Sequence, residues 1–337
     1  MKLRYERGRA QPGQNGKRFA FVLTTQVVLS CGRPDPIDLP VPQSTQPTGV
    51  ITIPSINDRP DIQGLAHFEL CQGTADSPSA GYLLVTVEEK NERSFMHFYS
   101  YVASGTQIEF SNQTPQSTPD YVNIPLESHV AGLSISDTVP CQTDPYLYYV
   151  NFSIGTKGWI YRVPLFEVLS DKARWPKSVE EVAMVQAASG LAVSTRRHKQ
   201  GQSQVCHDSL LVTRFYPGVG CGSACVMHEG VRGNWTTFPI AANTLDLRSQ
   251  GAEFVERGSD FFLMHTYNGA GTAFLEIREM NLGSATQAPS IGEQLFKIRI
   301  ERSHLIEEVS LTDGGWLLVG FEQKPSPTSD VFGVAPL

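Results

Sequence analysis

The stretch that decides the fold lies near the C-terminus, at residues 306–321, which read IEEVSLTDGGWLLVGF. Two apolar-rich runs flank the turn sequence Asp313-Gly314-Gly315, and their alternation of apolar and polar side chains is typical of β-strands. The Asp-Gly pair favours a tight turn between the runs. A Pro/Ser turn and another apolar run at 329–335 follow, so this stretch predicts three antiparallel strands in succession.

The same pattern recurs along the chain. Residues 253–267, EFVERGSDFFLMHTY, are followed by a glycine turn and a strand-like run at 271–278. Looser copies begin near Gln63, His129 and Val179, so that unit starts near 63, 129, 179, 252 and 304 are separated by roughly 50–70 residues. A further short run closes most units, at 107–110, 235–240 and 295–300. Each unit therefore predicts a small sheet of four antiparallel strands.

A sheet of four short strands cannot bury both of its faces alone, but repeated copies can bury them against one another. This is the arrangement of a β-propeller, and the units resemble the degenerate propeller repeats of bacterial secreted and surface proteins. The resemblance covers residues 50–337 and implies an all-β fold, a single β-propeller of about five four-stranded antiparallel blades. A strand near Val50–Ile53 would complete the last blade. Six blades, if residues 205–242 divide differently, or a β-sandwich are the alternatives.

Helices are expected to be few. The segments 167–172 and 179–186 are the plausible helical pieces, and we expect the second to be a strand.

The N-terminus has the features of an export signal. A basic stretch precedes a 12-residue apolar run, Phe19–Ser30, which is too short to span a bilayer. The sequence Val28-Leu29-Ser30-Cys31-Gly32 resembles the lipobox of bacterial lipoproteins. That resemblance implies a signal peptide over residues 1–30, cleavage before Cys31 and a diacylglycerol group on its sulfur. An ordinary signal peptide cleaved nearby and a disordered basic leader are the alternatives.

A proline-rich segment, residues 31–49, follows and predicts a semi-extended tether before the folded domain at 50–337. The lipobox resemblance places the protein in the bacterial cell envelope, with the membrane as a partner through the lipid on Cys31. Glycine rather than aspartate after that cysteine implies the outer membrane.

Charge argues against a nucleic-acid partner. The whole chain has a net charge of −7, and residues 1–30 hold six of its 27 basic and one of its 34 acidic side chains. The rest of the chain therefore carries −12, which repels phosphates. The candidate basic patch, Arg196-Arg197-His198-Lys199, lies among Gly and Gln and is expected to be a solvated loop.

Five cysteines besides Cys31 are disulfide candidates, because an exported protein permits oxidation. Cys71 and Cys141 occupy corresponding places in successive units, so a bond between them is reasonable. For the second group we favour a bond from Cys206 to Cys221 or Cys225. A zinc site formed by Cys206, Cys221, Cys225 and His228 is a weaker alternative, and we expect neither a metal nor another cofactor.

No catalytic residue is assigned. Hydrolysis of a glycosidic bond requires two facing carboxyl groups, and the acids that could converge near a propeller axis are Asp137, Asp208, Asp260 and Asp313. Asp260 and Asp313 lie in turn sequences, where aspartate commonly caps its own backbone. Strand positions predict packing roles for His97, His265 and Tyr267, and apolar runs predict the same for Trp159, Trp175, Trp235 and Trp316.

We therefore expect a lipid-anchored, non-catalytic propeller that binds a protein, another macromolecule or a glycan. An exported carbohydrate-active hydrolase is the alternative.

Overall fold

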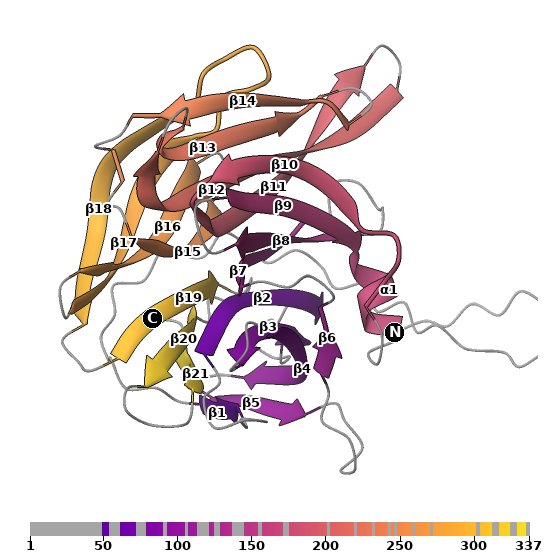
Figure 1. Cartoon of the computed structure of the whole chain (residues 1–337), viewed down its shortest axis with the longest axis vertical. Helices are drawn as coiled ribbons and strands as arrows, with labels where there is room; N and C mark the ends of the chain where they lie inside the picture. Colours follow the sequence, from indigo (N-terminus) through magenta and orange to yellow (C-terminus); the bar gives the residue numbers. More distant parts are fainter. Residues whose placement is uncertain are drawn as a thin grey trace, which may run out of the picture. The chain divides into compact units, whose positions relative to one another are not determined.

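The computed structural model of the chain describes residues 49–53, 61–71, 79–89, 93–104, 107–112, 121–124, 129–136, 145–153, 157–170, 175–200, 203–218, 221–230, 233–241, 244–245, 248–257, 260–269, 272–300, 304–311, 317–323 and 329–334. Most of these residues form antiparallel strands, which are grouped in five sheets (Figure 1). The all-β class predicted from the alternating runs is confirmed.

Four of the sheets, or blades, are made of consecutive strands. Blade 1 contains β2 (Asp61–Cys71), β3 (Ser79–Glu89), β4 (Arg93–Ser104) and β5 (Gln107–Asn112), with β6 (Tyr121–Asn123) paired to β4. Blade 2 contains β7 (His129–Ile135), β8 (Tyr146–Ser153), β9 (Lys157–Pro164) and β10 (Glu180–Gln186). Blade 3 contains β11 (Ala188–Gln200), β12 (Ser203–Gly218), β13 (Gly222–Glu229) and β14 (Trp235–Ile240). Blade 4 contains β15 (Ser249–Arg257), β16 (Asp260–Gly269), β17 (Thr272–Asn281) and β18 (Ser290–Ile300).

Blade 5 joins the two ends of the described chain. It contains β19 (His304–Leu311), β20 (Leu317–Gln323) and β21 (Ser329–Val334), and its outermost strand is β1 (Gly49–Ile53). β1 runs antiparallel to β21, from Gly49 opposite Gly333 to Ile53 opposite Ser329. In Figure 1 the indigo β1 lies beside the yellow β21. The closing strand predicted near Val50–Ile53 is confirmed.

The first strands of the blades contact one another in a closed cycle. β2 contacts β7, β7 contacts β11, β11 contacts β15, β15 contacts β19, and β19 contacts β2. The fold is therefore a β-propeller with five blades in the described part of the chain, and the sandwich and six-blade alternatives are wrong.

Each buried cluster of apolar side chains lies between neighbouring blades. Tyr148 and Ile160 of blade 2, for example, pack against Leu191 and Leu210 of blade 3. At the closure, Leu318 of β20 packs with residues of blade 1. Both faces of a blade are thus covered by its neighbours, which is why most strands are apolar on both faces.

Two predicted boundaries need correction. The segment 179–186 is a strand, as expected, but it forms the outer strand of blade 2 rather than the start of a third unit. Blade 3 begins with β11, after Ala187, which has a positive φ of 56°. The apolar alternation of β10 misled the unit assignment because an outer strand also has one covered face; Met184 on β10 is 52% exposed. The helix expected at 167–172 is α1 (Leu165–Ser170), which starts two residues earlier.

Candidate functional site

A surface pocket of about 350 Å³ lies at one end of blade 2, lined by Tyr146, Pro164, Phe166, Glu167 and Ser170. Tyr146, the first residue of β8, is directly opposite Pro164, the last residue of β9. Helix α1 continues from Pro164, and the amide of Leu165 donates a 2.8 Å hydrogen bond to the carbonyl of Pro145. One open strand pair and the short helix after it therefore build the pocket.

Helix α1 has one buried and one exposed face. Leu165 and Val168, three residues apart, are fully buried in the apolar cluster between blades 1 and 2. Phe166, Glu167 and Ser170 lie on the opposite face and are exposed. This spacing follows from 3.6 residues per turn. The buried face holds the helix on the propeller, and the other face turns an aromatic ring, a carboxylate and a hydroxyl toward the pocket.

Tyr146 is backed by a charged side chain. The guanidinium carbon of Arg162 lies 4.6 Å from the centroid of the Tyr146 ring, within cation–π range. Glu180 accepts two hydrogen bonds from Arg162, from Nε at 2.8 Å and from Nη2 at 3.1 Å. Glu229 accepts a third, from Nη1 at 2.7 Å. A guanidinium held at three of its nitrogens fixes the position of the ring that it stacks on.

The same cluster connects blade 2 to blade 3. The hydroxyl of Tyr148 donates to Asp208 Oδ2 at 2.5 Å, and the hydroxyl of Thr195 donates to Oδ1 at 2.6 Å. Arg162 Nη1 also donates to the Tyr148 hydroxyl, at 3.3 Å. Both oxygens of Asp208 thus accept hydrogen bonds from within the protein. Asp208, which is buried, therefore acts as a structural acid between two blades.

Burial dominates the electrostatics of this cluster. It raises the pKa of the Tyr148 hydroxyl, and the charge of Asp208 raises it further. Burial also raises the pKa of Asp208, against the hydrogen bonds from Thr195 and Tyr148. For Arg162, burial alone would lower the pKa, but the hydrogen bonds to Glu180, Tyr148 and Glu229 raise it. Arg162 is therefore a permanent cation behind the pocket.

The acids considered for catalysis are not gathered in this pocket. Asp208 lies on β12 of blade 3, as described above. Asp260 is the exposed first residue of β16 in blade 4. Asp137 and Asp313 lie outside the described residues. Glu167, which was not a candidate, is the carboxylate that lines the pocket.

A first serine–histidine–glutamate group lies on three inner strands. His67 Nδ1 of β2 is 2.6 Å from Ser310 Oγ of β19, and Ser310 donates a 3.1 Å hydrogen bond to Glu253 of β15. In a nucleophilic triad the histidine lies between the serine and the acid. Here the serine lies between the other two, so these contacts join blades rather than activate a nucleophile.

A second group has the order of a triad but is closed to substrate. Ser249 Oγ is 2.8 Å from His265 Nε2, and His265 Nδ1 is 3.4 Å from Glu276 Oε1. None of the three side chains is more than 1% exposed. Burial would raise the pKa of Glu276, but His265 and Arg278 lower it. The group is a buried polar network, and the packing role predicted for His265 is confirmed.

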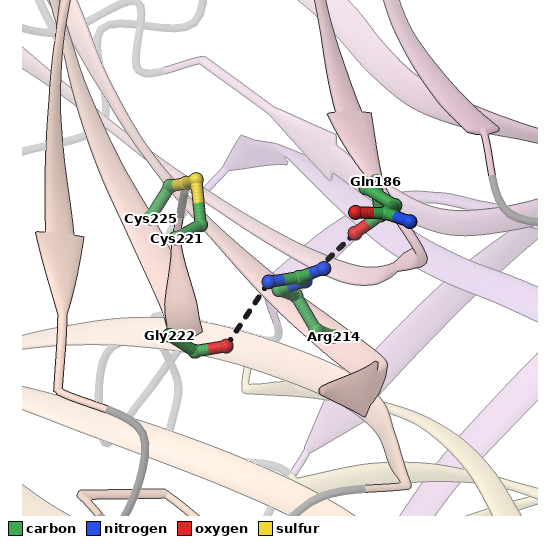
Figure 2. The surroundings of a disulfide bond; sticks show 5 residues. All are labelled: Gln186, Arg214, Cys221, Gly222 and Cys225. Atoms are coloured by element: carbon green, nitrogen blue, oxygen red, sulfur yellow. Dashed lines mark hydrogen bonds between the residues drawn. A yellow bond between two sulfur atoms is a disulfide. The ribbon is translucent and has the colours of Figure 1, made fainter. Parts of the chain in front are cut away.

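Cys221 and Cys225 form a disulfide at the start of β13 (Figure 2). The expected bond from Cys206 to either of them is therefore wrong, although Cys206 too is a disulfide cysteine. Sulfur atoms joined in a disulfide also cannot supply the thiolates of the zinc alternative. His228, its proposed imidazole ligand, is buried in β13, where Nδ1 lies 2.8 Å from Ser209 Oγ.

The structure describes only the backbone of Cys71, which ends β2, and Cys141 lies outside the described residues. The part of the chain that the structure describes contains no group of three or more His, Cys, Asp or Glu side chains placed to bind a metal.

Figure 2 also shows a buried cation near the disulfide. The guanidinium of Arg214 donates to the carbonyl of Gln186 at 2.7 Å and to that of Gly222 at 3.1 Å. Burial lowers the pKa of Arg214. These hydrogen bonds tie β12 to the end of β10 and to the segment that carries the disulfide.

The basic cluster at 196–199 is not a loop, because β11 extends to Gln200 and pairs with β12 continuously from Leu191 to Gln200. Arg196 lies over the ring of Phe261 at 5.0 Å. Trp175 and Trp235 pack against apolar clusters, as predicted. Trp159 is half-buried, with Lys157 Nζ at 5.9 Å from its ring, and Trp316 lies outside the described residues.

Sequence reasoning missed the pocket and the cation behind it. One signal was present, because Arg162 interrupts the apolar run Trp159–Val163, and a charge inside such a run indicates a buried ion pair. No comparable signal marks Phe166 or Ser170, whose roles depend on where α1 begins.

Comparison with known proteins found neither a matching family model nor a matching curated protein. Three solved structures are similar to this chain. A mutant α-L-arabinanase of Cellvibrio cellulosa has 10% identity over 80% of this chain and 90% of its own, with a TM-score of 0.40. A luciferin-regenerating enzyme has 11% identity over 86% and 97%, with a TM-score of 0.37. The soluble aldose sugar dehydrogenase of Escherichia coli has 8% identity over 86% and 100%, with a TM-score of 0.31.

None of the helices in the described ranges is long and apolar enough to cross a membrane.

Proposed function

We propose that this protein is a lipid-anchored β-propeller of the bacterial cell envelope, located at the outer membrane. It binds a glycan or another macromolecule and catalyses no reaction on it. The pocket beside α1 is the observation that carries the binding role. Its lining combines the aromatic rings of Tyr146 and Phe166 with a proline, the carboxylate of Glu167 and the hydroxyl of Ser170. Binding pockets commonly combine an apolar lining with a few polar groups in this way.

The state of the buried acids supports binding without catalysis. A general acid or nucleophile must reach the substrate. Asp208 and Glu276 are buried and accept hydrogen bonds from other side chains of the protein. Glu253 accepts one from Ser310. Within the pocket, Glu167 is the one carboxylate, whereas glycoside hydrolysis needs a pair.

The envelope location rests on the lipobox-like sequence ending at Cys31, and mass spectrometry tests it. The full chain and a Cys31→Ala variant are expressed in a bacterium, and their membrane fractions are compared. We expect the wild-type protein to begin at Cys31, to carry diacylglycerol and to fractionate with the outer membrane. We expect the variant to lack the lipid. A soluble, full-length, unlipidated wild-type product would contradict the proposal.

Co-sedimentation tests the binding role. Full-length protein in detergent is mixed with insoluble cellulose, chitin or peptidoglycan, and the pellet is assayed for protein and the supernatant for reducing ends. Sedimentation without release of reducing ends supports a binding protein. Release of reducing ends that tracks the purified protein would favour the hydrolase alternative instead. Failure to sediment with any of the three would contradict glycan binding.

A further inference from the structure

The pocket beside α1 is suited to one kind of ligand, and its size sets the first limit. A volume of about 350 Å³ is near the lower end of small-molecule sites, which span about 300–1,000 Å³. Its two aromatic lining residues, Tyr146 and Phe166, belong to strand β8 and helix α1. A ligand in this pocket is therefore small or is one unit of a longer chain.

Charge argues against an anionic ligand. The positive charge of Arg162 is compensated by the carboxylates of Glu180 and Glu229, so it does not draw an anion into the pocket. An anionic ligand would meet the carboxylate of Glu167 in the pocket, and the exposed Glu180 and Glu181 lie on the neighbouring β10. A neutral ligand avoids this repulsion.

Hydrogen bonding separates the neutral ligands. Glu167 accepts a hydrogen bond from the hydroxyl of Ser178 at Oε2, and a carboxylate can accept further ones. Ser170 donates its hydroxyl to the backbone carbonyl of Glu167 at 3.1 Å, which leaves its oxygen able to accept. A purely apolar group would remove water from these oxygens without replacing its hydrogen bonds. A ligand that carries hydroxyl donors around an apolar face meets both needs.

We infer that this pocket binds one neutral sugar ring, whose apolar face packs on Phe166 and Tyr146 and whose hydroxyls donate to Glu167 and Ser170. The inference rests on the proposed binding function and names the ligand class for that site. Arg162 is a positioning residue here, because it holds Tyr146 and does not itself line the pocket.

Ligand-detected NMR tests the inference with full-length protein in detergent. The probes are glucose, galactose, arabinose and N-acetylglucosamine as neutral sugars and glucuronate as the anionic one. We expect at least one neutral sugar to bind, and glucuronate to bind more weakly. Tighter binding of glucuronate than of every neutral sugar would overturn the inference.

Two variants locate the sugar. Phe166→Ala removes a ring that is 43% exposed and leaves Leu165 and Val168 to hold α1. Glu167→Gln keeps the shape and removes the charge. Aromatic stacking predicts that Phe166→Ala weakens binding at least about tenfold, and we expect a smaller loss for Glu167→Gln. Tyr216→Ala, at an aromatic residue 54% exposed on blade 3, is the matched control and should leave binding unchanged.

The outcomes distinguish this inference from the broader function. If a neutral sugar binds equally to wild type, Phe166→Ala and Glu167→Gln, the pocket assignment is wrong although the protein is a glycan binder. If no neutral sugar binds while the protein still co-sediments with a polysaccharide, the single-ring inference is wrong and the binding function stands. Thermal unfolding of each variant shows whether a loss of binding reflects unfolding.

Discussion

Acidification should destabilise this propeller through one buried histidine. His97 lies on β4, opposite Val85 of β3, and is 4% exposed. Strand alternation places it on the same face as Phe95 and Tyr99, which belong to the apolar cluster of blade 1. Its Nε2 atom has no hydrogen-bond partner among the described residues. Burial lowers the pKa of His97 from 6.5 to about 4, because the imidazolium would lose its water shell.

The sign and the size of the effect follow from this shift. As the pH falls below 6.5, the unfolded chain binds a proton that the folded protein refuses until about pH 4. The free energy of unfolding therefore decreases across that window and levels off below it. A shift of this size corresponds to a loss of about 3 kcal/mol. The folded protein lowers the pKa of Glu276 from its ordinary value of 4.5. The stabilisation that Glu276 provides is therefore lost only as the pH falls below 4.5, which is below most of the His97 window.

Urea unfolding monitored by tryptophan fluorescence between about pH 4.5 and pH 8 measures this dependence. We expect the wild-type free energy of unfolding to decrease by up to about 1.4 kcal/mol per pH unit below pH 6.5. His97→Leu should remove most of that slope. Met96→Leu, a change at the neighbouring buried residue without a titrating group, should lower stability but keep the slope. If His97→Leu keeps the wild-type slope, the reasoning is refuted.

Three further measurements test the packing of the blades and the cysteines. Gly190→Ala would place a Cβ 2.5 Å from a buried threonine hydroxyl and 3.0 Å from the carbonyl of Gln250, so we expect urea unfolding to show a loss of about 2–3 kcal/mol; a loss below about 0.5 kcal/mol would show that the strands can separate freely. Arg162→Met leaves the buried Tyr148 hydroxyl and the partly buried Glu229 without their cation and should cost about 1–3 kcal/mol in the same assay; an unchanged unfolding midpoint would show that these hydrogen bonds do not stabilise the fold. Non-reducing tryptic mapping should recover Cys221 and Cys225 bonded within one peptide and Cys206 bonded to a different cysteine, whereas a peptide joining Cys206 to Cys221 would contradict the structure.

The blade count could be predicted because it depends on local signals. Alternating runs and turn residues determine hairpins over short distances. The closing strand at Gly49–Ile53 could also be expected, since a propeller needs its last blade completed, and the apolar run at 50–53 was available.

The disulfide could not be predicted because it depends on a local break in a strand. Residues four apart in an extended strand are about 13 Å apart, yet the Cα atoms of Cys221 and Cys225 are 5.1 Å apart. Gly222 has a φ of 62°, and the pairing of β13 with β14 shifts register between Gly222 and Ala224. That turn brings the two cysteines together. Spacing alone therefore favoured the wrong partner, Cys206.

The pocket escaped prediction for a related reason. The pocket forms because Tyr146 pairs with Pro164 across β8 and β9 and because α1 begins at Leu165. A shift of the helix to the expected 167–172 would have placed Phe166 outside it.

The inner strands contain a repeat that marks the start of four of the five blades. Four of them carry a glycine just before a buried apolar residue, and these glycines are Gly64, Gly132, Gly190 and Gly251. At Gly132, which has a φ of 63°, a Cβ would lie 2.7 Å from the carbonyl oxygen of Ser189 on the next inner strand. The glycine thus lets the backbones of adjacent blades approach closely.

In blade 5 the corresponding place is held by Glu308, which pairs with Gly320 just after a register shift, as Gly64 pairs with Thr86. Its carboxylate lies against Gly251, and its Oε1 accepts the Val309 amide at 3.2 Å. Four glycines and one glutamate thus occupy equivalent positions, and the carboxylate of the fifth blade uses the space that the glycine of the fourth leaves open. The constraint that repeats most regularly in this chain is therefore close backbone approach between blades. The Asp-Gly turn of residues 313–314 recurs less faithfully than this glycine.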